Sequence, residues 1–341
     1  MRILKKRIWF NKWFNTAYHF IDLIKNNNEG VQFEVFGTHT NMNSAVLSIC
    51  NYVEAEPSVY GEDYIDYCIS FCKKHKIDIF IPCYQMLNIS QHIKEFNNVG
   101  TLVLASDNSS LLQTINNKPK FYELCKQNGT MELPQYFVVN TADEFMNAYR
   151  ELLSKGLRVC VKPAISEGGF GFRIINDDCD DFKDFFGELN NEISSNEVYR
   201  ILSLKESFEG LMVLEYLDGY EYSIDCLAYE GKLLAAVPRK KIDGRVRLLE
   251  NVPELIDIAR KMSETYKLPY ISNVQVKYAD GIPKLLEINP RMSGGLHISC
   301  LSGINFPYLA IKLLQGEKVD VLTPNDNIMV TQIEKEILLT K

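Results

Sequence analysis

A lysine at the end of an apolar run is followed by a glycine-rich segment, and residues of these types in this order can bind phosphate. Lys162 lies in the run VCVKP, and Gly168, Gly169 and Gly171 follow it. Glycines let backbone N–H groups approach phosphate oxygens closely, and the lysine adds a positive charge. A flexible hairpin loop with an incidental lysine is the competing interpretation. For this segment alone it is the stronger one.

A second polar group follows the run VLEYL. If Glu221, Ser223 and Asp225 lie on one strand, they share a face, because successive side chains of a strand point to opposite sides. A carboxylate on that face could accept hydrogen bonds from the two hydroxyls of a ribose. A solvated strand face is the competing interpretation, and these three residues alone favour it.

The most informative group combines two strands, SNVQVKY and PKLLEIN, with a turn between them. Alternation places Asn273, Gln275 and Lys277 on one face of the first strand, and Glu287 and Asn289 on one face of the second. Burying such polar groups together is costly unless they hold something. Oxygen ligands on a shared face suit Mg²⁺ that is bridged to phosphates. The pattern therefore predicts a metal site.

The length of the turn decides whether the two strands present these ligands together. A loop of three or five residues pairs Gln275 with Glu287 and puts both on one face. A two-residue turn at Asp280–Gly281 pairs Gln275 with Leu286 instead and moves Glu287 to the opposite face. We expect the odd-numbered loop, although Asp-Gly favours a tight turn. A two-residue turn without a bulge would exclude a shared metal site.

The residues directly after the second strand could contact a substrate. Arg291 is suited to pairing with a phosphoryl group in transfer. The segment Met292–Gly295 is rich in small residues, which would let a substrate come close. His297 is the one histidine near this group in the sequence, and a lone histidine is more often structural than catalytic.

The secondary structure predicted around these residues changes in type along the chain. Up to about residue 110, apolar runs at Gln32–Phe36, Ile77–Pro82 and Thr101–Ala105 alternate with helical patterns such as Glu62–His75. This alternation predicts a small doubly wound α/β domain with a parallel sheet. Its first strand is not followed by Gly-x-Gly-x-x-Gly, and no Walker-type motif occurs, so neither a dinucleotide site nor a P-loop is indicated.

The rest of the chain is predicted to be α+β. A helix over residues 118–128 should end at Gly129, and another should begin after Thr141 and close at Gly156. From residue 157 to 290 the signals are strands with polar turns, and only Pro253–Tyr266 among them is clearly helical.

Composition bounds the class of protein. The 341 residues suffice for two or three subdomains, and the 46% of apolar residues is typical of a soluble globular protein. A formal net charge of −7 gives no global attraction to nucleic acid or an anionic membrane. No stretch approaches the roughly 20 apolar residues of a membrane span. The nine scattered cysteines, an odd number without Cys-x-x-Cys, indicate no disulfide framework. We expect a cytoplasmic protein.

The order of these motifs resembles the ATP-grasp superfamily, within it the large-subunit halves of carbamoyl-phosphate synthase and similar carboxylate–amine ligases. The closest matches are SNVQ and EINPRMSGG. The resemblance covers residues 105–320 with motifs, and the N-terminal domain by architecture. The residues that carry it, in order, are Lys118, Lys162 with its glycine loop, Glu215-Tyr216-Leu217, Glu221, Gln275, Glu287, Asn289 and Arg291.

The resemblance implies a nucleotide site. Lys118 and Lys162 would contact the phosphates of ATP, with Lys162 also near the adenine, and Glu221 would bind the ribose. Backbone groups of Glu215, Tyr216 and Leu217 would hold the adenine edge. The loop that closes over the phosphates would include Glu167, Gly168, Gly169 and Gly171.

The resemblance also implies the metal site and the chemistry. Gln275, Glu287 and Asn289 would bind two Mg²⁺ ions, for which Mn²⁺ is able to substitute, and Arg291 would stabilise the transferring phosphoryl group. A carboxylate would be phosphorylated by ATP and then attacked by an amine, with Lys162, Arg291 and Arg239 as catalytic groups. Arg239, in the basic stretch Pro238–Arg247, would bind the carboxylate, although a solvated charge run is the competing interpretation.

Four segments and two alternative functions follow from the resemblance. Residues 1–110 would form a pre-ATP-grasp domain, 111–212 a lid subdomain, 213–323 the subdomain with the metal site, and 324–341 a tail. The substrates would be a small-molecule carboxylate and an amine, such as amino acids. A homodimer remains open. The alternatives are an enzyme that phosphorylates bicarbonate or carbamate, as in carbamoyl-phosphate synthase, and a non-catalytic ATP-binding module.

Overall fold

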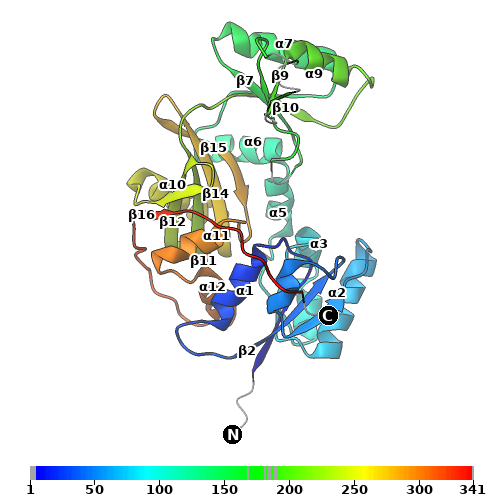
Figure 1. The fold of residues 1–341 in the computed structure, drawn as a ribbon, viewed down its shortest axis with the longest axis vertical. Coiled ribbons are helices and arrows are strands. Elements are labelled where there is room, and N and C mark those ends of the chain that lie inside the picture. Colours follow the sequence, from blue (N-terminus) through cyan, green and yellow to red (C-terminus); the bar gives the residue numbers. More distant parts are fainter. Residues whose placement is uncertain (1–4, 167–168, 180–181, 183–185, 188–189, 340–341) are drawn as a thin grey trace. The chain divides into compact units, whose positions relative to one another are not determined.

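The computed structural model describes residues 5–166, 169–179, 182, 186–187 and 190–339 (Figure 1). These residues form three β-sheets with helices against them, and they divide into two compact units. Unit 1 comprises residues 1–113, 222–275 and 288–341, and unit 2 comprises residues 114–221 and 276–287. The predicted loop residues Glu167 and Gly168 lie outside the described residues.

The N-terminal elements form a five-stranded parallel sheet of order β3-β2-β1-β4-β5, as predicted. The predicted helix Glu62–His75 has the same bounds in the structure. The elements are β1 (Lys6–Phe10), α1 (Ala17–Lys25), β2 (Phe33–His39), the 3₁₀ helix η1 (Ala45–Ile49), β3 (Tyr52–Ala55), α2 (Glu62–His75), β4 (Ile79–Ile81), α3 (Met86–Gln91), α4 (Ile93–Asn98) and β5 (Leu102–Val103).

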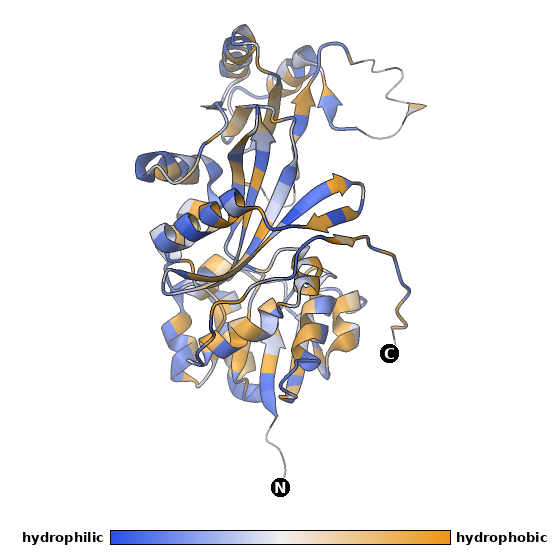
Figure 2. Ribbon diagram, turned by 90° about the vertical axis from the view of Figure 1, so that its left-hand side faces the viewer, coloured by the Kyte–Doolittle hydropathy of each residue, from blue (hydrophilic) through white to orange (hydrophobic). Residues whose placement is uncertain are grey.

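Both faces of the sheet are buried at its central strands, where β4 and the last three residues of β1 are apolar. Ile8 and Phe10 of β1 belong to the core on one face, and Trp9 belongs to the core on the other. Trp9 stacks on Phe80 with ring centroids 4.0 Å apart. Figure 2 shows hydrophobic and hydrophilic stretches on the surrounding helices, as expected where one side of a helix packs on a sheet.

Unit 2 is built on a second sheet of order β6-β10-β7-β8-β9. The predicted helix ends hold: Gly129 closes α6 in a left-handed conformation at φ 56°, and the Thr141 hydroxyl accepts the Glu144 N–H at the start of α7. The elements are α5 (Ser109–Asn116), α6 (Lys118–Asn128), β6 (Tyr136–Val139), α7 (Ala142–Ser154), β7 (Val159–Pro163), β8 (Arg173–Ile175), β9 (Glu192–Ile193), α9 (Ser195–Leu202) and β10 (Leu211–Glu215).

A third sheet has the order β15-β14-β11-β12-β13-β16, and strands β14 and β15 run through both units. The predicted helix Pro253–Tyr266 is α10. The other elements are β11 (Glu221–Tyr229), β12 (Lys232–Asp243), β13 (Val246–Leu249), β14 (Tyr270–Ala279), β15 (Ile282–Asn289), α11 (Leu296–Ser299), the 3₁₀ helix η2 (Cys300–Ser302), α12 (Phe306–Leu314) and β16 (Ile328–Val330).

The expected odd-numbered loop between β14 and β15 is wrong. The strands end at Ala279 and resume at Ile282, so the turn is the two-residue Asp280–Gly281. Both turn residues have positive φ, 50° and 77°, as in the type I′ turn whose twist matches that of a hairpin. The Asp-Gly dipeptide was therefore the better guide.

The predicted domain boundary at residues 212 and 213 falls inside β10, which pairs with β6 and β7. No helix among the described residues has the length and apolarity that crossing a bilayer requires.

Candidate functional site

Two lysines and a carboxylate meet in unit 2. Lys118 is the first residue of α6, and its Nζ lies 2.6 Å from the carbonyl oxygen of Ser166 and 3.7 Å from Glu287 Oε2. Lys162, on β7, places its Nζ 3.2 Å from the carbonyl oxygen of Leu286. The sequence predicted that Lys118, Lys162 and Glu287 belong to one site, and in the structure all three gather around the end of β15.

The ammonium group of Lys162 has a lowered pKa. Burial is the largest cause, with the positive charge of Lys118 second, and together they lower the pKa of Lys162 to about 8. The carboxylate of Glu287 acts in the opposite direction and raises it. An anion bound between the two lysines would relieve their repulsion.

Strand β15 is irregular where it reaches this cluster. Pro283 and Leu285 are buried and Lys284 and Leu286 are partly exposed, but Glu287 is partly exposed as well. The Tyr122 hydroxyl oxygen lies 2.8 Å and 2.9 Å from the consecutive carbonyl oxygens of Leu285 and Leu286. In a regular strand these carbonyls point to opposite sides. We interpret the irregularity as a bulge, which turns Glu287 to the side of Leu286.

With the two-residue turn, a metal site shared by the two strands depends on such a bulge, and it stays a prediction. Without the bulge, Glu287 would share a face with buried Leu285. With it, Glu287 has the exposure that a ligand needs, and Asn289 follows on the same side beyond buried Ile288. Gln275 and Asn289 belong to unit 1 and Glu287 to unit 2. The three stay a predicted metal set, whose oxygen donors fit Mg²⁺.

The segment predicted to hold the adenine begins with a buried ion pair. Glu215, 6% exposed, ends β10, and both its oxygens lie within 2.9 Å of Lys284 Nζ. The Gln135 N–H donates to the same carboxylate. Next in the chain, Tyr216 has Arg158 4.6 Å and Lys277 4.5 Å from its ring centroid.

Lys284 was missed in the sequence. It stands on the exposed side of β15, and across a two-residue turn its strand partner is Lys277, so a tight Asp-Gly turn would have placed both lysines on one face. The odd-numbered register hid this relationship.

The other described residues predicted for the nucleotide site lie in unit 2. Leu217 is buried, and Glu221 begins β11. Gly169 and Gly171 have φ of 75° and 76°.

Unit 1 contains a buried polar network centred on Asp225, whose side chain is fully buried. Asn273 Nδ2 and Ser293 Oγ donate to its Oδ1 at 2.7 Å and 2.8 Å. Ser299 Oγ donates to its Oδ2 at 2.6 Å, and Arg239 Nη2 lies 3.2 Å from that oxygen. The interpretation of this strand face as solvated is therefore wrong for Asp225, and also for Ser223, which is 5% exposed.

Arg239 is part of this network rather than of a solvated charge run. It is 5% exposed, and its Nε and Nη2 lie 3.3 Å from Ser299 Oγ and 3.5 Å from Ser293 Oγ. A Cβ on Gly295 would come within 2.5 Å of the guanidinium, so only glycine lets Arg239 lie against this backbone. Binding of a carboxylate by Arg239 stays a prediction.

Arg291 and His297 flank the same segment. The Arg291 guanidinium lies 5.7 Å from the ring of Phe14, and its Nη1 donates to the Met292 carbonyl. His297 stacks on His19 with ring centroids 4.4 Å apart. Burial, together with the charges of His19 and Arg239, lowers the pKa of His297 to about 4, so this imidazole is neutral at pH 7.

Chemically, the cluster in unit 2 combines cations for a polyanion with a carboxylate that can hold a divalent metal ion. Of the described residues, no three His, Cys, Asp or Glu side chains cluster as a metal site. The set of Gln275, Glu287 and Asn289 stays the sequence prediction for a metal site.

Comparisons of sequence identify related proteins. A family model described as an ATP-grasp in the biosynthetic pathway with the Ter operon matches residues 207–336. The arginine-specific large chain of carbamoyl phosphate synthase from Geobacillus stearothermophilus is 23% identical over 233 residues. The match covers 62% of this chain and 20% of that protein, so the chain spans about a fifth of the length of this curated relative.

Comparisons of structure cover nearly the whole chain. An ADP complex of N5-carboxyaminoimidazole ribonucleotide synthetase matches with a TM-score of 0.69 at 12% identity, over 96% of this chain and 82% of that one. L-amino acid ligase from Bacillus licheniformis matches with a TM-score of 0.63 at 15% identity, over 91% and 74%. At these identities the likeness shows the fold alone.

Proposed function

We propose that this chain is an ATP-dependent ligase, from the premise that it has the ATP-grasp fold and that its residues 207–336 match an ATP-grasp family model, as the motifs predicted. It joins a carboxylate to an amine through an acyl phosphate and releases ADP and phosphate. The observation that carries the proposal is the cluster of Lys118, Lys162 and Glu287 at the end of β15. Two cations and a metal-binding carboxylate there suit the phosphates of Mg²⁺-ATP.

In the first step a carboxylate oxygen attacks the γ-phosphorus of ATP. A P–O bond forms to the carboxylate, the bond to the β-phosphate oxygen breaks, and ADP leaves. Lys118 and Lys162 hold the phosphates, and Arg291 offsets the charge that develops on the transferring group. Gln275, Glu287 and Asn289 would hold the metal ions, which when bound would supply positive charge to the phosphates.

In the second step the amine attacks the carbonyl carbon of the acyl phosphate. A C–N bond forms, the amine loses a proton, and the C–O bond to phosphate breaks. The products are an amide and inorganic phosphate. The glycine loop would close over the phosphates and exclude water, which would otherwise hydrolyse the intermediate.

The remaining roles follow the predicted order of motifs. The segment Glu215–Leu217 holds the adenine edge and Glu221 the ribose, with the Lys284 pair fixing the start of this segment. Arg239, which lies against Gly295 and 3.5 Å from Ser293 Oγ, binds the substrate carboxylate. The second candidate, phosphorylation of bicarbonate or carbamate, is favoured by the likeness to the carbamoyl phosphate synthase large chain.

The test is release of ADP from Mg²⁺-ATP in the presence of amino-acid pools, with and without bicarbonate. The Glu287→Gln variant is the blank. Release that requires an amino-acid pool supports the ligase, and splitting the pool then identifies the two substrates. Release with bicarbonate alone favours the second candidate. If no carboxylate in a wide panel stimulates release above the blank, the protein is a nucleotide-binding module and the proposal is wrong.

Affinity for nucleotide should fall as the pH rises past about 8. Lys162 has a lowered pKa of about 8, so it loses its proton in this range and with it the charge that contacts phosphate. Above the pKa, one lost charge weakens binding by at most tenfold per pH unit. Calorimetric titration with MgADP between pH 6.5 and 9.5 measures the effect. In Lys162→Arg, whose guanidinium stays protonated, the same titration should be flat.

A further inference from the structure

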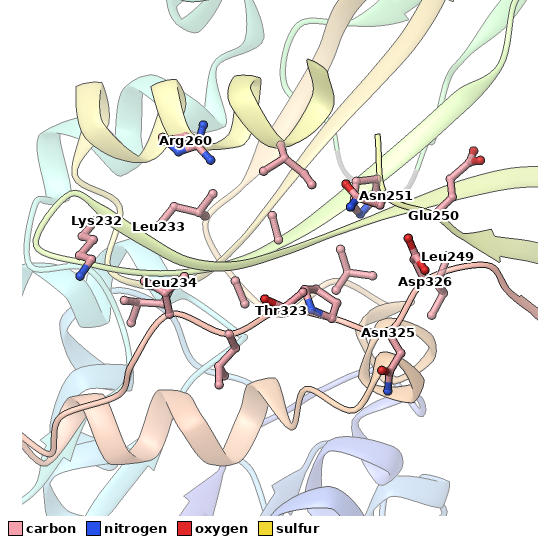
Figure 3. A pocket seen from close by; sticks show the side chains of 18 of the residues that line it. Lys232, Leu233, Leu234, Leu249, Glu250, Asn251, Arg260, Thr323, Asn325 and Asp326 are labelled. Carbon is pink, nitrogen blue, oxygen red and sulfur yellow. The ribbon is translucent and has the colours of Figure 1, made fainter. Parts of the chain in front are cut away.

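Unit 1 contains a cavity of about 480 Å³ that none of the predicted nucleotide or metal residues lines (Figure 3). It is bounded by the first half of β12, by helix α10, by residues 249–251 and by the segment 321–326. A volume of this size lies within the range of small-ligand sites. Much of the wall is apolar, with side chains such as Leu233, Val237, Ile256 and Leu322.

One wall of this cavity is an open strand edge. Strand β12 pairs with β11 along one edge, but on the other edge β13 covers only Arg239 to Asp243. Before that point, the Leu234 carbonyl accepts the Leu322 N–H at 2.8 Å, and the Pro238 carbonyl accepts the Glu250 N–H at 3.2 Å. The two donors belong to different segments, 321–326 and 249–251, and the cavity is lined by both of them and by the part of β12 between the two bonds.

Ala236 lies at the middle of this open edge. The backbone groups of a strand point to alternate edges, and β12 pairs regularly with β11 from Ala235 to Lys240. Ala236 therefore directs its groups to the same edge as Pro238, away from β11. The N–H and C=O of Ala236 therefore face the cavity that this residue lines. Such a pair is what an added strand uses for main-chain hydrogen bonds.

Charged side chains are separated along the cavity. Figure 3 shows Lys232 and Arg260 toward one end, and Glu250 and Asp326 toward the other. Glu264 also lines the cavity, four residues after Arg260 on α10, and Arg260 contacts Asp257, so the charges of Lys232, Arg260, Glu264 and Asp257 sum to zero at the first end. At the second end Lys240 lies 3.8 Å from Glu250, so the charges of Glu250, Asp326 and Lys240 sum to −1. A ligand with a carboxylate at one end and an ammonium at the other complements this arrangement.

We propose that this cavity binds a short peptide with apolar side chains as an added strand on the open edge of β12. Its amide groups would pair with Ala236, its carboxylate would lie near Lys232 and Arg260, and its ammonium near Glu250 and Asp326. The edge from Leu234 to Pro238 spans about 13 Å at roughly 3.3 Å per residue. That length accommodates three or four residues. This site goes beyond the proposed function and does not depend on it.

Calorimetric titration of the full chain with the tripeptide Ala-Leu-Val, without nucleotide, tests the proposal. We expect saturable binding at 1:1 stoichiometry. A tripeptide with an N-methylated central amide should bind at least tenfold more weakly, because it lacks one main-chain donor, and so should a tripeptide with both ends capped. These ligand changes leave the protein untouched, so a folding defect cannot explain them.

Variants of the protein complete the test. Arg260→Gln and Asp326→Asn should each weaken binding of the uncapped peptide about threefold to tenfold, with little effect on the capped one. Lys318→Gln, a change at an exposed residue that does not line the cavity, is the control. Glu287→Gln should bind the peptide as the wild type does, which separates this site from the proposed active site. No binding at 10 mM peptide, or equal binding of free, capped and methylated peptides, would overturn the proposal.

Discussion

Replacing Asp225 by asparagine should lower the free energy of unfolding by about 3–5 kcal/mol. The variant removes the charge that compensates the Arg239 guanidinium in a place where both side chains are at least 95% buried. It also replaces an acceptor of four hydrogen bonds by a group with only one acceptor oxygen. Equilibrium unfolding in urea measures the change. Asp320→Asn, on an exposed aspartate, is the matched control and should leave stability within about 0.5 kcal/mol.

The double variant Asp225→Asn with Arg239→Met separates the unpaired charge from the lost hydrogen bonds. Removing both charges should recover a large part of the stability, because a buried pair contributes little net energy while an unpaired buried charge costs much. If the single Asp225 variant unfolds at the wild-type urea concentration, the network does not hold this part of unit 1 together.

The Glu287→Gln variant should lower kcat for ADP release by about 10²- to 10³-fold, if the proposed function is right. The amide keeps the shape of the side chain but removes the negative charge beside Lys118 and near Lys162. Steady-state kinetics with saturating substrates measures the loss. Glu209→Gln, on an exposed glutamate of unit 2, should retain full activity.

This variant has a second readout that a loss of fold would not produce. Glu287 raises the pKa of Lys162, so its removal should move that pKa further below 8. The pH at which MgADP affinity begins to fall should therefore shift to lower values than in the wild type. Wild-type kcat, or an unchanged pH profile in a folded variant, would show that Glu287 does not act at the phosphates.

Local signals predicted the elements well. Helices α2 and α10 have the predicted bounds, and Gly129 and Thr141 cap the helices they were expected to cap. These features depend on neighbours within a few residues, such as the hydroxyl of Thr141 and the N–H of Glu144. The order of motifs then located Lys118, Lys162 and Glu287, although these residues are far apart in the chain.

The interior of unit 1 could not be predicted in this way. Asp225 is buried because donors 14, 48, 68 and 74 residues away reach it, and no local pattern marks such a convergence. The same holds for Glu215, whose partner Lys284 is 69 residues away. The hairpin shows a different limit of prediction. The two-residue turn and the irregularity at Leu286 each change the face of β15 on which Glu287 lies. The face of Glu287 can therefore be predicted only when both features are known.

The division of the chain into units has a consequence for biosynthesis. Residues 114–221 leave the ribosome well before residues 276–287, yet both belong to unit 2. Until the later hairpin has been made, the carboxylate of Glu215 lacks the ammonium group of Lys284. Tyr122 likewise lacks the two carbonyl groups of Leu285 and Leu286. Unit 2 is therefore completed only after most of the chain has been synthesised. A fragment that ends at residue 221 would lack part of unit 2, and the carboxylate of Glu215 in it would have no ion-pair partner at Lys284.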